Sequence, residues 1–346
     1  MIGVVGSTGF TGKLVAAELR RRAASFFIAG RNANLLKSLS ESLGGVETRL
    51  LDVRDQKTFS ALDGVSVILN CAGPYTDLGE PVVQEAIARR AHYLDLTGEQ
   101  GFIKLVYDKY DQLAKDAGVA LVPACAFEYA IGDAAAAIAC AGLTDCELVE
   151  IVYHVTGMYT SAGTRKSIIR AFTAPGFRFS GGRLIESEFG GLIKKVRIEG
   201  KEFSALSFPA GEPLMLPKHT KVREVNAFMT ADLPVAFLKL AAASQPVLKL
   251  FADFLVHNAV TDHTPSEIQR KTTAVTMKIT AKNSAEERQI TLSGKDPYGV
   301  TAVIAVDAAM HLQSKGPSVA GAISPSMINS AEAIREVLIT NGFSWS

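Results

Sequence analysis

A short segment near the start of the sequence has the residue types and spacing of a phosphate-binding loop. It follows a strand-like apolar run at residues 2–5. It consists of Gly6, Ser7, Thr8, Gly9, Phe10, Thr11 and Gly12. Gly6 would permit a tight turn, Gly9 would let the backbone approach a pyrophosphate, and Gly12 would let the next helix pack closely on the strand. Amides at the helix N-terminus and the loop hydroxyls would then bind the phosphates, which predicts a dinucleotide site; a tight turn without a ligand is the alternative.

The end of the second strand-like run indicates which dinucleotide would bind. An NAD site usually carries an Asp or Glu there, about 20 residues after the loop, which binds the ribose hydroxyls. This sequence has Arg31 and Asn32 at that place and no carboxylate. A guanidinium can pair with a 2′-phosphate, so we predict NADP(H) rather than NAD(H). The alternative is a solvated surface arginine.

Two further strand ends fit the same site. Asp52 and Val53 close the third run, where a carboxylate and a backbone N–H could meet an adenine ring. The fourth run ends on residues small enough for the backbone to pass the ribose and the nicotinamide. These residues are Cys71, Ala72, Gly73 and Pro74.

Reduction by a nicotinamide also needs a group that supplies a proton. None of the 8 tyrosines is followed four residues later by lysine, which excludes the Tyr-x-x-x-Lys mechanism of short-chain dehydrogenases. Among the acids and phenols at the strand ends, including Asp95 and Tyr129, we take Tyr75, Glu99 and Glu128 as candidate catalytic residues. Each also has a local alternative, such as capping a turn or a helix.

The second half of the chain offers a candidate substrate site. Ser161, Thr164 and Arg165 stand at the start of a predicted helix, where they could bind a substrate carboxylate or phosphate. Ordinary helix capping by the hydroxyls is the alternative. The apolar stretch around residues 233–254 reads most simply as core or dimer interface, and a lipid-chain groove is a lesser hypothesis.

The helices and strands that would position these residues follow a different order before and after residue 130. Before it, apolar runs alternate with helical segments, which is typical of a doubly wound parallel sheet. The strands are predicted at 2–5, 26–29, 47–51, 65–70, 93–96 and 119–123, and the helices near 12–22, 33–43, 80–91 and 102–117. After it come a helix at 133–142, strands at 147–156, 183–190, 193–198, 222–228, 273–282 and 288–293, and helices at 233–256, 299–313 and 330–340.

We therefore predict an α/β Rossmann-type doubly wound parallel sheet followed by a second α+β domain. The helices at 233–256 and 299–313 would cover one face of the second sheet. Composition narrows the function classes further. The 36 basic and 35 acidic residues nearly balance, which argues against a nucleic-acid partner.

Metal and membrane sites are not expected from the residue pattern. The 4 cysteines and 6 histidines show no metal-binding spacing, so we predict no metal. We expect no membrane span, because no charge-free run reaches about 20 residues. The chain opens directly on a strand-like run, and we expect a cytoplasmic protein with reduced, mostly buried thiols.

Taken together, the motifs resemble those of the saccharopine dehydrogenase-like oxidoreductases, and among them most the trans-acting enoyl reductases. The segments that carry the resemblance are 10–14, 29–32, 71–75, 79–83, 92–99, 161–167 and 294–302. The resemblance implies a Rossmann domain completed by the last helix, here residues 1–130 with about 318–346. It also implies an α+β domain at 131–317 for substrate and dimer contacts, hence a homodimer. One segment departs from the family: residues 125–133 read Cys-Ala-Phe-Glu-Tyr-Ala-Ile-Gly-Asp in place of Cys-Gly-Phe-Asp-Ser-x-Pro-Ser-Asp.

The family resemblance implies NADPH-linked reduction of a C=C or C=N bond in a small or acyl-chain substrate. Two alternatives remain at this point. One is a sensor that binds NADP(H) without turnover, and the other is a lipid-surface scaffold.

Overall fold

The computed structural model describes residues 1–157, 159–173, 176–231 and 264–346, which divide into two units. Unit 1 comprises Met1–Thr97, Phe102–Ala130 and Tyr298–Ala333. Unit 2 comprises Gly98–Gly101, Ile131–Pro297 and Ile334–Ser346.

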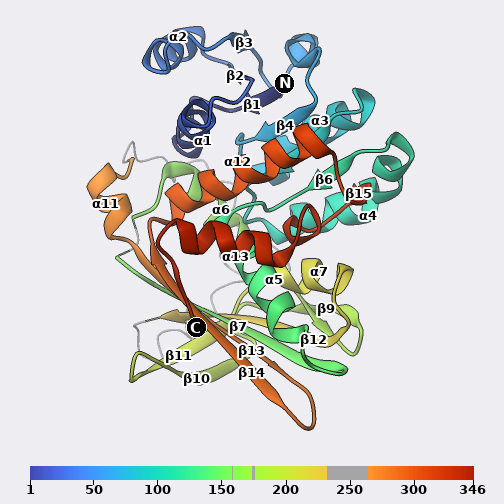
Figure 1. Cartoon of the computed structure of the whole chain (residues 1–346), viewed down its shortest axis with the longest axis vertical. Coiled ribbons are helices and arrows are strands. Elements are labelled where there is room, and N and C mark those ends of the chain that lie inside the picture. The colour runs from blue at the N-terminus through green and yellow to red at the C-terminus, as the bar shows by residue number, and fades with distance from the viewer. Residues whose placement is uncertain (158, 174–175, 232–263) are drawn as a thin grey trace. The chain divides into compact units, whose positions relative to one another are not determined.

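Unit 1 is built on a seven-stranded sheet in which every pairing is parallel (Figure 1). The strands are β1 (Ile2–Val5), β2 (Phe26–Gly30), β3 (Thr48–Leu50), β4 (Val67–Asn70), β5 (His92–Asp95), β6 (Ala120–Val122) and β15 (Gly321–Ala322). Their order across the sheet is β15-β6-β5-β4-β1-β2-β3. The central strands are buried along their whole length and are apolar apart from Asn70 at the end of β4, as a parallel sheet covered on both faces requires.

Helices lie between these strands along the chain. They are α1 (Phe10–Arg21), α2 (Ala33–Ser42), α3 (Tyr75–Ala88), α4 (Gln100–Ala117), α5 (Phe127–Cys140) and α12 (Pro297–Lys315), with a 3-10 helix, η1, at Gln56–Leu62. α5 passes into unit 2 after Ala130. α1 packs on β1, α2 on β2 and β3, and α3 on β4 and β5. The predicted doubly wound fold is thereby confirmed.

Two helices begin earlier than the sequence predicts, and each has a physical reason. α3 begins at Tyr75 rather than near residue 80, because Gly79 does not break the helix: a Cβ there would lie 2.4 Å from the Phe102 ring, so the glycine permits close packing. α5 begins at Phe127 rather than at residue 133. Its first backbone N–H donates to Thr301 Oγ1 at 3.1 Å, a partner far away in sequence.

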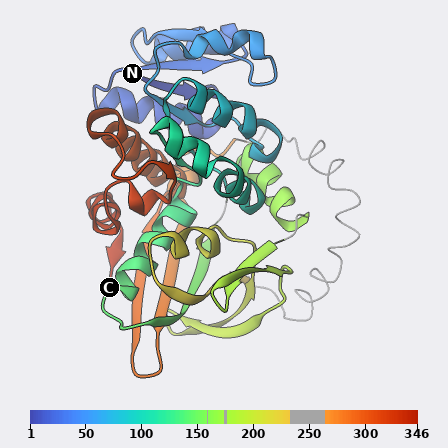
Figure 2. The same cartoon turned by 90° about the vertical axis from the view of Figure 1, so that its right-hand side faces the viewer.

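Unit 2 is built on a nine-stranded mixed sheet. Its strands are β7 (Cys146–Thr156), β8 (Gly176–Ser180), β9 (Arg183–Ser187), β10 (Ile193–Ile198), β11 (Lys201–Ser207), β12 (Val222–Ala231), β13 (Ala274–Lys282), β14 (Glu287–Lys295) and β16 (Ser344–Trp345). The main path runs β10-β11-β12-β7-β13-β14-β16, and β8 joins β12 to β9. Among the described strands of this second sheet, only β12 and β7 pair in parallel. Figure 2 shows β13 and β14 as a long orange hairpin.

The alternation predicted for the second sheet is present. Val275, Met277, Ile279 and Ala281 on β13 are all buried, and the residues between them are on average more exposed. The helical segments of unit 2 include α6 (Ala162–Thr173), α7 (Glu212–Met215), η2 (Leu216–Lys218) and α11 (Glu267–Thr272). The predicted helix at 233–256 lies outside the described residues. The α+β character of this unit agrees with the prediction.

The C-terminal part of the chain is divided differently from the predicted boundaries. α12 is grouped with unit 1 from Tyr298 onward, and not with the unit of the second sheet as predicted; its Asp307 forms an ion pair with Arg22 at 3.0 Å. Within α13 (Ala331–Thr340) the chain passes to unit 2. The end of the chain stays there because β16 pairs with β14. η3 (Pro325–Met327) lies in unit 1.

Candidate functional site

The strand order of unit 1 creates one place where neighbouring loops diverge. From β1 the chain proceeds to β2 and β3 on one side, whereas β4, β5 and β6 lie on the other. The loops after β1 and β4 therefore leave the sheet in opposite directions at their carboxyl ends. In open parallel sheets this switch point is where ligands bind.

The loop after β1 has a shape that only glycine allows at two positions. Gly6 has a φ of +71°, and a Cβ there would lie 2.8 Å from the backbone nitrogen of Ala72 in the loop after β4. A Cβ on Gly12 would lie 2.5 Å from the carbonyl oxygen of Gly6 and 2.8 Å from Cα of Ser7. The two loops of the switch point thus pack backbone against backbone, and α1 starts directly on the turn.

The N-terminus of α1 is suited to an anion. Gly9 is exposed at the N-cap position, and among the described residues no side chain caps this helix end. The first turn of α1 carries no acidic residue. Backbone amides at a helix N-terminus bind phosphate groups, so this cradle fits the diphosphate of a dinucleotide.

The hydroxyl residues of the loop have different roles, and one prediction needs correction. Ser7 is fully buried, and both its backbone N–H and its Oγ donate to the carbonyl of Ala29 at 3.1 Å. Ser7 therefore ties the loop to β2 instead of offering its hydroxyl to a phosphate. Thr8 lies beside Gly30 at the end of β2, and Thr11 is partly exposed. Phe10 packs edge-on against Tyr298, with ring centroids 4.9 Å apart.

The end of β2 carries the two residues predicted to select the coenzyme. Arg31 is exposed there. Asn32 caps α2, since its Oδ1 accepts a hydrogen bond from Leu35 N at 3.0 Å. The Asn32 side chain is thus engaged in holding α2, while Arg31 reaches solvent at the strand end.

The residues after β3 form a turn of their own. Asp52 Oδ1 accepts a hydrogen bond from Arg54 N at 3.0 Å, and the Asp52 backbone N–H donates to Thr58 Oγ1 at 3.1 Å. Val53 is buried beside them. The carboxylate of Asp52 thus stabilises the turn in which it lies.

The loop after β4 runs from Cys71 to Pro74 and is held by a buried network that the sequence analysis missed. Asn70 Oδ1 accepts from Ala72 N at 3.0 Å, and Asn70 Nδ2 donates to the Tyr93 hydroxyl at 3.2 Å. The Tyr75 hydroxyl donates to the Asn70 carbonyl at 3.2 Å. A buried asparagine closing the apolar run of β4 was the available signal. Gly73 is exposed next to this network.

Asp95 is the buried charge at this edge. Its Oδ1 accepts hydrogen bonds from Thr97 N and Ala124 N, both at 2.9 Å. Burial and, secondly, the charge of Asp95 raise the pKa of the Cys71 and Cys125 thiols well above their ordinary value. Both cysteines stay protonated and are poor nucleophiles, which agrees with the predicted inert thiols.

The three candidate catalytic residues lie in different surroundings. Tyr75 is buried and bonds to the β4 backbone, as described. Glu99, in unit 2, is buried and its Oε1 accepts a hydrogen bond from Ser167 Oγ at 2.9 Å. Glu128 lies in the first turn of α5, where burial raises its pKa from the ordinary value of a glutamate.

The candidate substrate residues form the start of α6. Ser161 Oγ accepts a hydrogen bond from Thr164 N at 3.2 Å and lies 3.0 Å from Thr164 Oγ1. Arg165 Nη1 donates to the Thr160 carbonyl at 2.6 Å. These contacts are those of helix capping, the alternative that the sequence left open.

Metal sites and membrane spans can be assessed for the described part of the chain. It contains no group of three or more His, Cys, Asp or Glu side chains placed to hold a metal ion. It also contains no helix that is both long and apolar enough to span a membrane. The apolar stretch at 233–254, predicted as core or dimer interface, lies outside the described residues.

Comparison with known proteins identifies the N-terminal segment. Residues 2–122 match the family model of the saccharopine dehydrogenase NADP-binding domain. A trans-acting enoyl reductase of Mycobacterium ulcerans is 34% identical over 134 residues, which cover 37% of this chain and 32% of the relative. A saccharopine dehydrogenase-like oxidoreductase of Bos taurus is 29% identical over 147 residues, which cover 36% of this chain and 34% of that protein. This chain spans about a third of the length of these curated relatives.

Among solved structures, the fold is similar to that of saccharopine dehydrogenase (L-Glu forming) from Saccharomyces cerevisiae. The TM-score is 0.64 at 12% identity, over 100% of this chain and 99% of the yeast chain. The match to this family model confirms the predicted resemblance and the predicted nicotinamide coenzyme.

Proposed function

We propose that this chain, whose residues 2–122 match a saccharopine dehydrogenase NADP-binding domain, is an NADP(H)-dependent oxidoreductase. It would reduce a C=C or C=N bond of a small or acyl-chain substrate. The observation that carries the proposal is the glycine cradle at the switch point between β1 and β4. There the loop backbone and the uncapped start of α1 converge on one place.

Different residues of unit 1 would bind different parts of the coenzyme. The amides following Gly9 would bind the diphosphate, and Gly6 and Gly12 would keep the loop in the required shape. Arg31 would pair with the 2′-phosphate, because its guanidinium is exposed at the end of β2 where no carboxylate competes. The bound nicotinamide would supply the hydride.

Glu128 is the best of the three candidates for the proton donor. A general acid must keep its proton at the working pH, and burial raises the pKa of Glu128 in that direction. If Glu128 donates the proton, the reduction rate falls as pH rises through its raised pKa.

The substrate class rests on the relatives. One relative is named a trans-acting enoyl reductase and another a saccharopine dehydrogenase-like oxidoreductase, so enoyl C=C and imine C=N bonds are both proposed. Ser161, Thr164 and Arg165 remain proposed contacts for an anionic substrate group, in addition to their capping role. A homodimer and a cytoplasmic location are likewise proposals.

Calorimetry of the full chain with NADPH and with NADH tests the first step. We expect heat with NADPH and a weaker response with NADH. No heat with either coenzyme would overturn the proposal. The nicotinamide absorbance is then followed with α,β-unsaturated acyl thioesters and with imines.

Glu128→Gln tests the proposed proton donor. We expect kcat to fall about 100-fold or more, since general acids contribute on that scale, with NADPH binding unchanged. Glu41→Gln, an exposed position on α2, is the matched control. Undiminished turnover in Glu128→Gln would exclude this role. Tight NADPH binding without hydride transfer to any substrate would favour the sensor.

A further inference from the structure

Two of the four cysteines lie together in unit 2, whereas the proposed coenzyme site belongs to unit 1. Cys140 is the last residue of α5, and Cys146 is the first residue of β7. Their sulfur atoms are 3.0 Å apart, with the Cys140 thiol donating to the Cys146 sulfur. A disulfide bond is about 2.05 Å long, so a movement of about 1 Å would bring the two atoms to bonding distance.

The segment between the two cysteines is short and anchored. Leu143 N donates to the Cys140 carbonyl at 2.9 Å, and Asn283 Nδ2 donates to the Thr144 carbonyl at 2.8 Å. The Arg288 guanidinium lies so close to Gly142 that a Cβ there would meet it at 1.8 Å. These contacts fix the segment that joins the two cysteines.

Cys146 is the more reactive member of the pair. The hydrogen bond from Cys140 lowers the pKa of the Cys146 thiol, whereas the same bond and burial raise the pKa of Cys140. The thiolate is the nucleophilic form of cysteine. The pair therefore contains an attacking sulfur and a resolving sulfur in contact.

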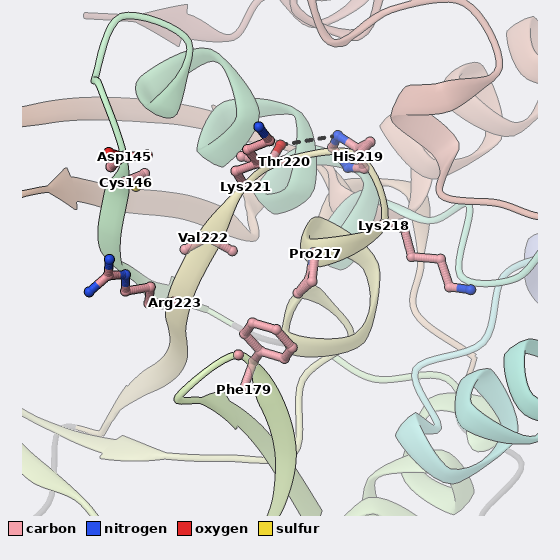
Figure 3. Close-up of a pocket in the computed structure, with 11 residues that line it drawn as sticks. Asp145, Cys146, Phe179, Pro217, Lys218, His219, Thr220, Lys221, Val222 and Arg223 are labelled. Carbon is pink, nitrogen blue, oxygen red and sulfur yellow. Dashed lines mark hydrogen bonds between the residues drawn. The ribbon is translucent and has the colours of Figure 1, made fainter.

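A cavity lies next to Cys146, whose side chain is itself buried. The cavity has a volume of about 490 Å³, and both Asp145 and Cys146 line it (Figure 3). Figure 3 shows these two residues together at the start of β7. Val222, which pairs with Cys146, lies on the neighbouring β12. Lys221 and Arg223 flank Val222 and also line the cavity. Reactive cysteines are found in such electropositive, partly accessible surroundings.

We propose that Cys140 and Cys146 are a reversible redox modification site, which hydrogen peroxide entering this cavity converts to a disulfide. The Cys146 thiolate attacks one peroxide oxygen, the O–O bond breaks, and the departing oxygen leaves as water after taking up a proton. Cys146 is then a sulfenic acid. The Cys140 sulfur attacks it, the S–S bond forms and the S–O bond breaks. The Cys140 proton leaves with the oxygen as a second water, so two thiols are oxidised and one peroxide is reduced.

The other two cysteines provide a control within the same chain. Burial and the charge of Asp95 raise the pKa of Cys71 and Cys125, and the two thiols are not bonded to each other in the structure. They should therefore remain reduced while the pair in unit 2 is oxidised.

Treatment of the full reduced chain with graded hydrogen peroxide tests this site. Thiols are counted with a maleimide mass tag after denaturation, and the tagged peptides are mapped. We expect loss of two thiols together, a peptide linked through Cys140 and Cys146, and full recovery with dithiothreitol. Retention of all four thiols, or oxidation of Cys71 and Cys125 at the same rate, would overturn the proposal.

Single substitutions separate the two roles. Cys146→Ser should slow the loss of the first thiol at least about tenfold, because the remaining thiols are poor nucleophiles. Cys140→Ser should stop at a sulfenic acid on Cys146, detected by its dimedone adduct. Cys125→Ala is the control and should still lose the pair. Since the thiol count of the wild-type chain is informative alone, a poorly folding variant does not remove the test. Oxidation of Cys146→Ser at the wild-type rate would contradict the assignment.

Discussion

The two sheets of this chain differ in topology, although both units hold buried polar side chains that form hydrogen bonds. In unit 1 all strand pairings are parallel, so the strand ends gather at one edge and present backbone amides and loop residues there. In unit 2 the sheet is mixed, and several buried polar side chains bond to one another. Tyr153 donates to the Glu212 carboxylate, and His219 Nε2 lies 2.9 Å from Asp133 Oδ1. Changes in the loops of unit 1 should therefore weaken ligand binding, whereas changes to buried polar groups of unit 2 should weaken folding.

The largest effect is expected from Gly12→Ala. The added Cβ would collide with the Gly6 carbonyl and the Ser7 backbone, neither of which can move without displacing α1. We expect NADPH binding to weaken at least about 100-fold, or about 2.7 kcal/mol, in calorimetry. Gly101→Ala, where a Cβ would meet nothing within 4 Å, should bind as the wild type does. Unchanged NADPH affinity in Gly12→Ala would contradict the expectation that changes in the loops of unit 1 weaken ligand binding.

Gln100→Ala tests whether loss of a buried polar group in unit 2 weakens folding. The Gln100 side chain donates to the Phe177 and Ala210 carbonyls at 2.8 and 2.5 Å and accepts from Phe177 N at 2.8 Å. Its removal leaves these buried backbone groups without that partner, so the free energy of unfolding should fall by about 2–4 kcal/mol. Urea unfolding measures this. Gln112→Ala, exposed on α4, should change it little, and equal stabilities of the two variants would count against our interpretation.

Arg31→Ala should have a smaller and more selective effect. Hydrogen bonds to charged groups contribute about 1.5–3 kcal/mol, so we expect NADPH affinity to fall about 10- to 100-fold. NADH affinity should hardly change, because NADH lacks the 2′-phosphate. Arg54→Ala, another exposed arginine near a strand end, is the control. If both coenzymes lose affinity equally, Arg31 does not select between them.

The smallest effect concerns the pH dependence of stability. Burial raises the pKa of Glu128 in the folded chain, so the folded state holds this proton more tightly than the unfolded state does. The stabilisation is complete below the unfolded pKa of about 4.3 and is lost as pH rises through the folded value. The wild type should therefore lose stability relative to Glu128→Gln between acidic and neutral pH. Denaturant unfolding of both proteins at several pH values measures the difference, and a constant difference would contradict the raised pKa.

The sequence predicted unit 1 well because its signals are local. Each central strand is an unbroken apolar run, and the glycine loop joins the first of them directly to a helix. Where the determining contact is distant, the prediction failed. The start of α5 depends on Thr301, and Gly79 serves packing against Phe102 instead of breaking α3. Neither relation can be seen in the spacing of neighbouring residues.

The candidate site was predictable to the extent that it consists of backbone. The turn at Gly6 and the close approach at Gly12 follow from residue type and position. Side-chain roles were less accessible, because they depend on what each group meets in the folded chain. Ser7 bonds to Ala29 and Asn32 to its own helix. Asn70 and Tyr93 were missed because their network joins two strands that pair only in the folded sheet.

The division of the chain into units has a consequence for its synthesis. Unit 1 takes residues Met1–Thr97 and Phe102–Ala130 and then Tyr298–Ala333, which the ribosome adds some 170 residues later. β15, which pairs with β6, and Thr301, which accepts from Phe127 N, both belong to that late segment. The nascent N-terminal part thus leaves the ribosome with β6 as an open edge. It should remain sensitive to proteases or dependent on chaperones until Tyr298–Ala333 have been synthesised.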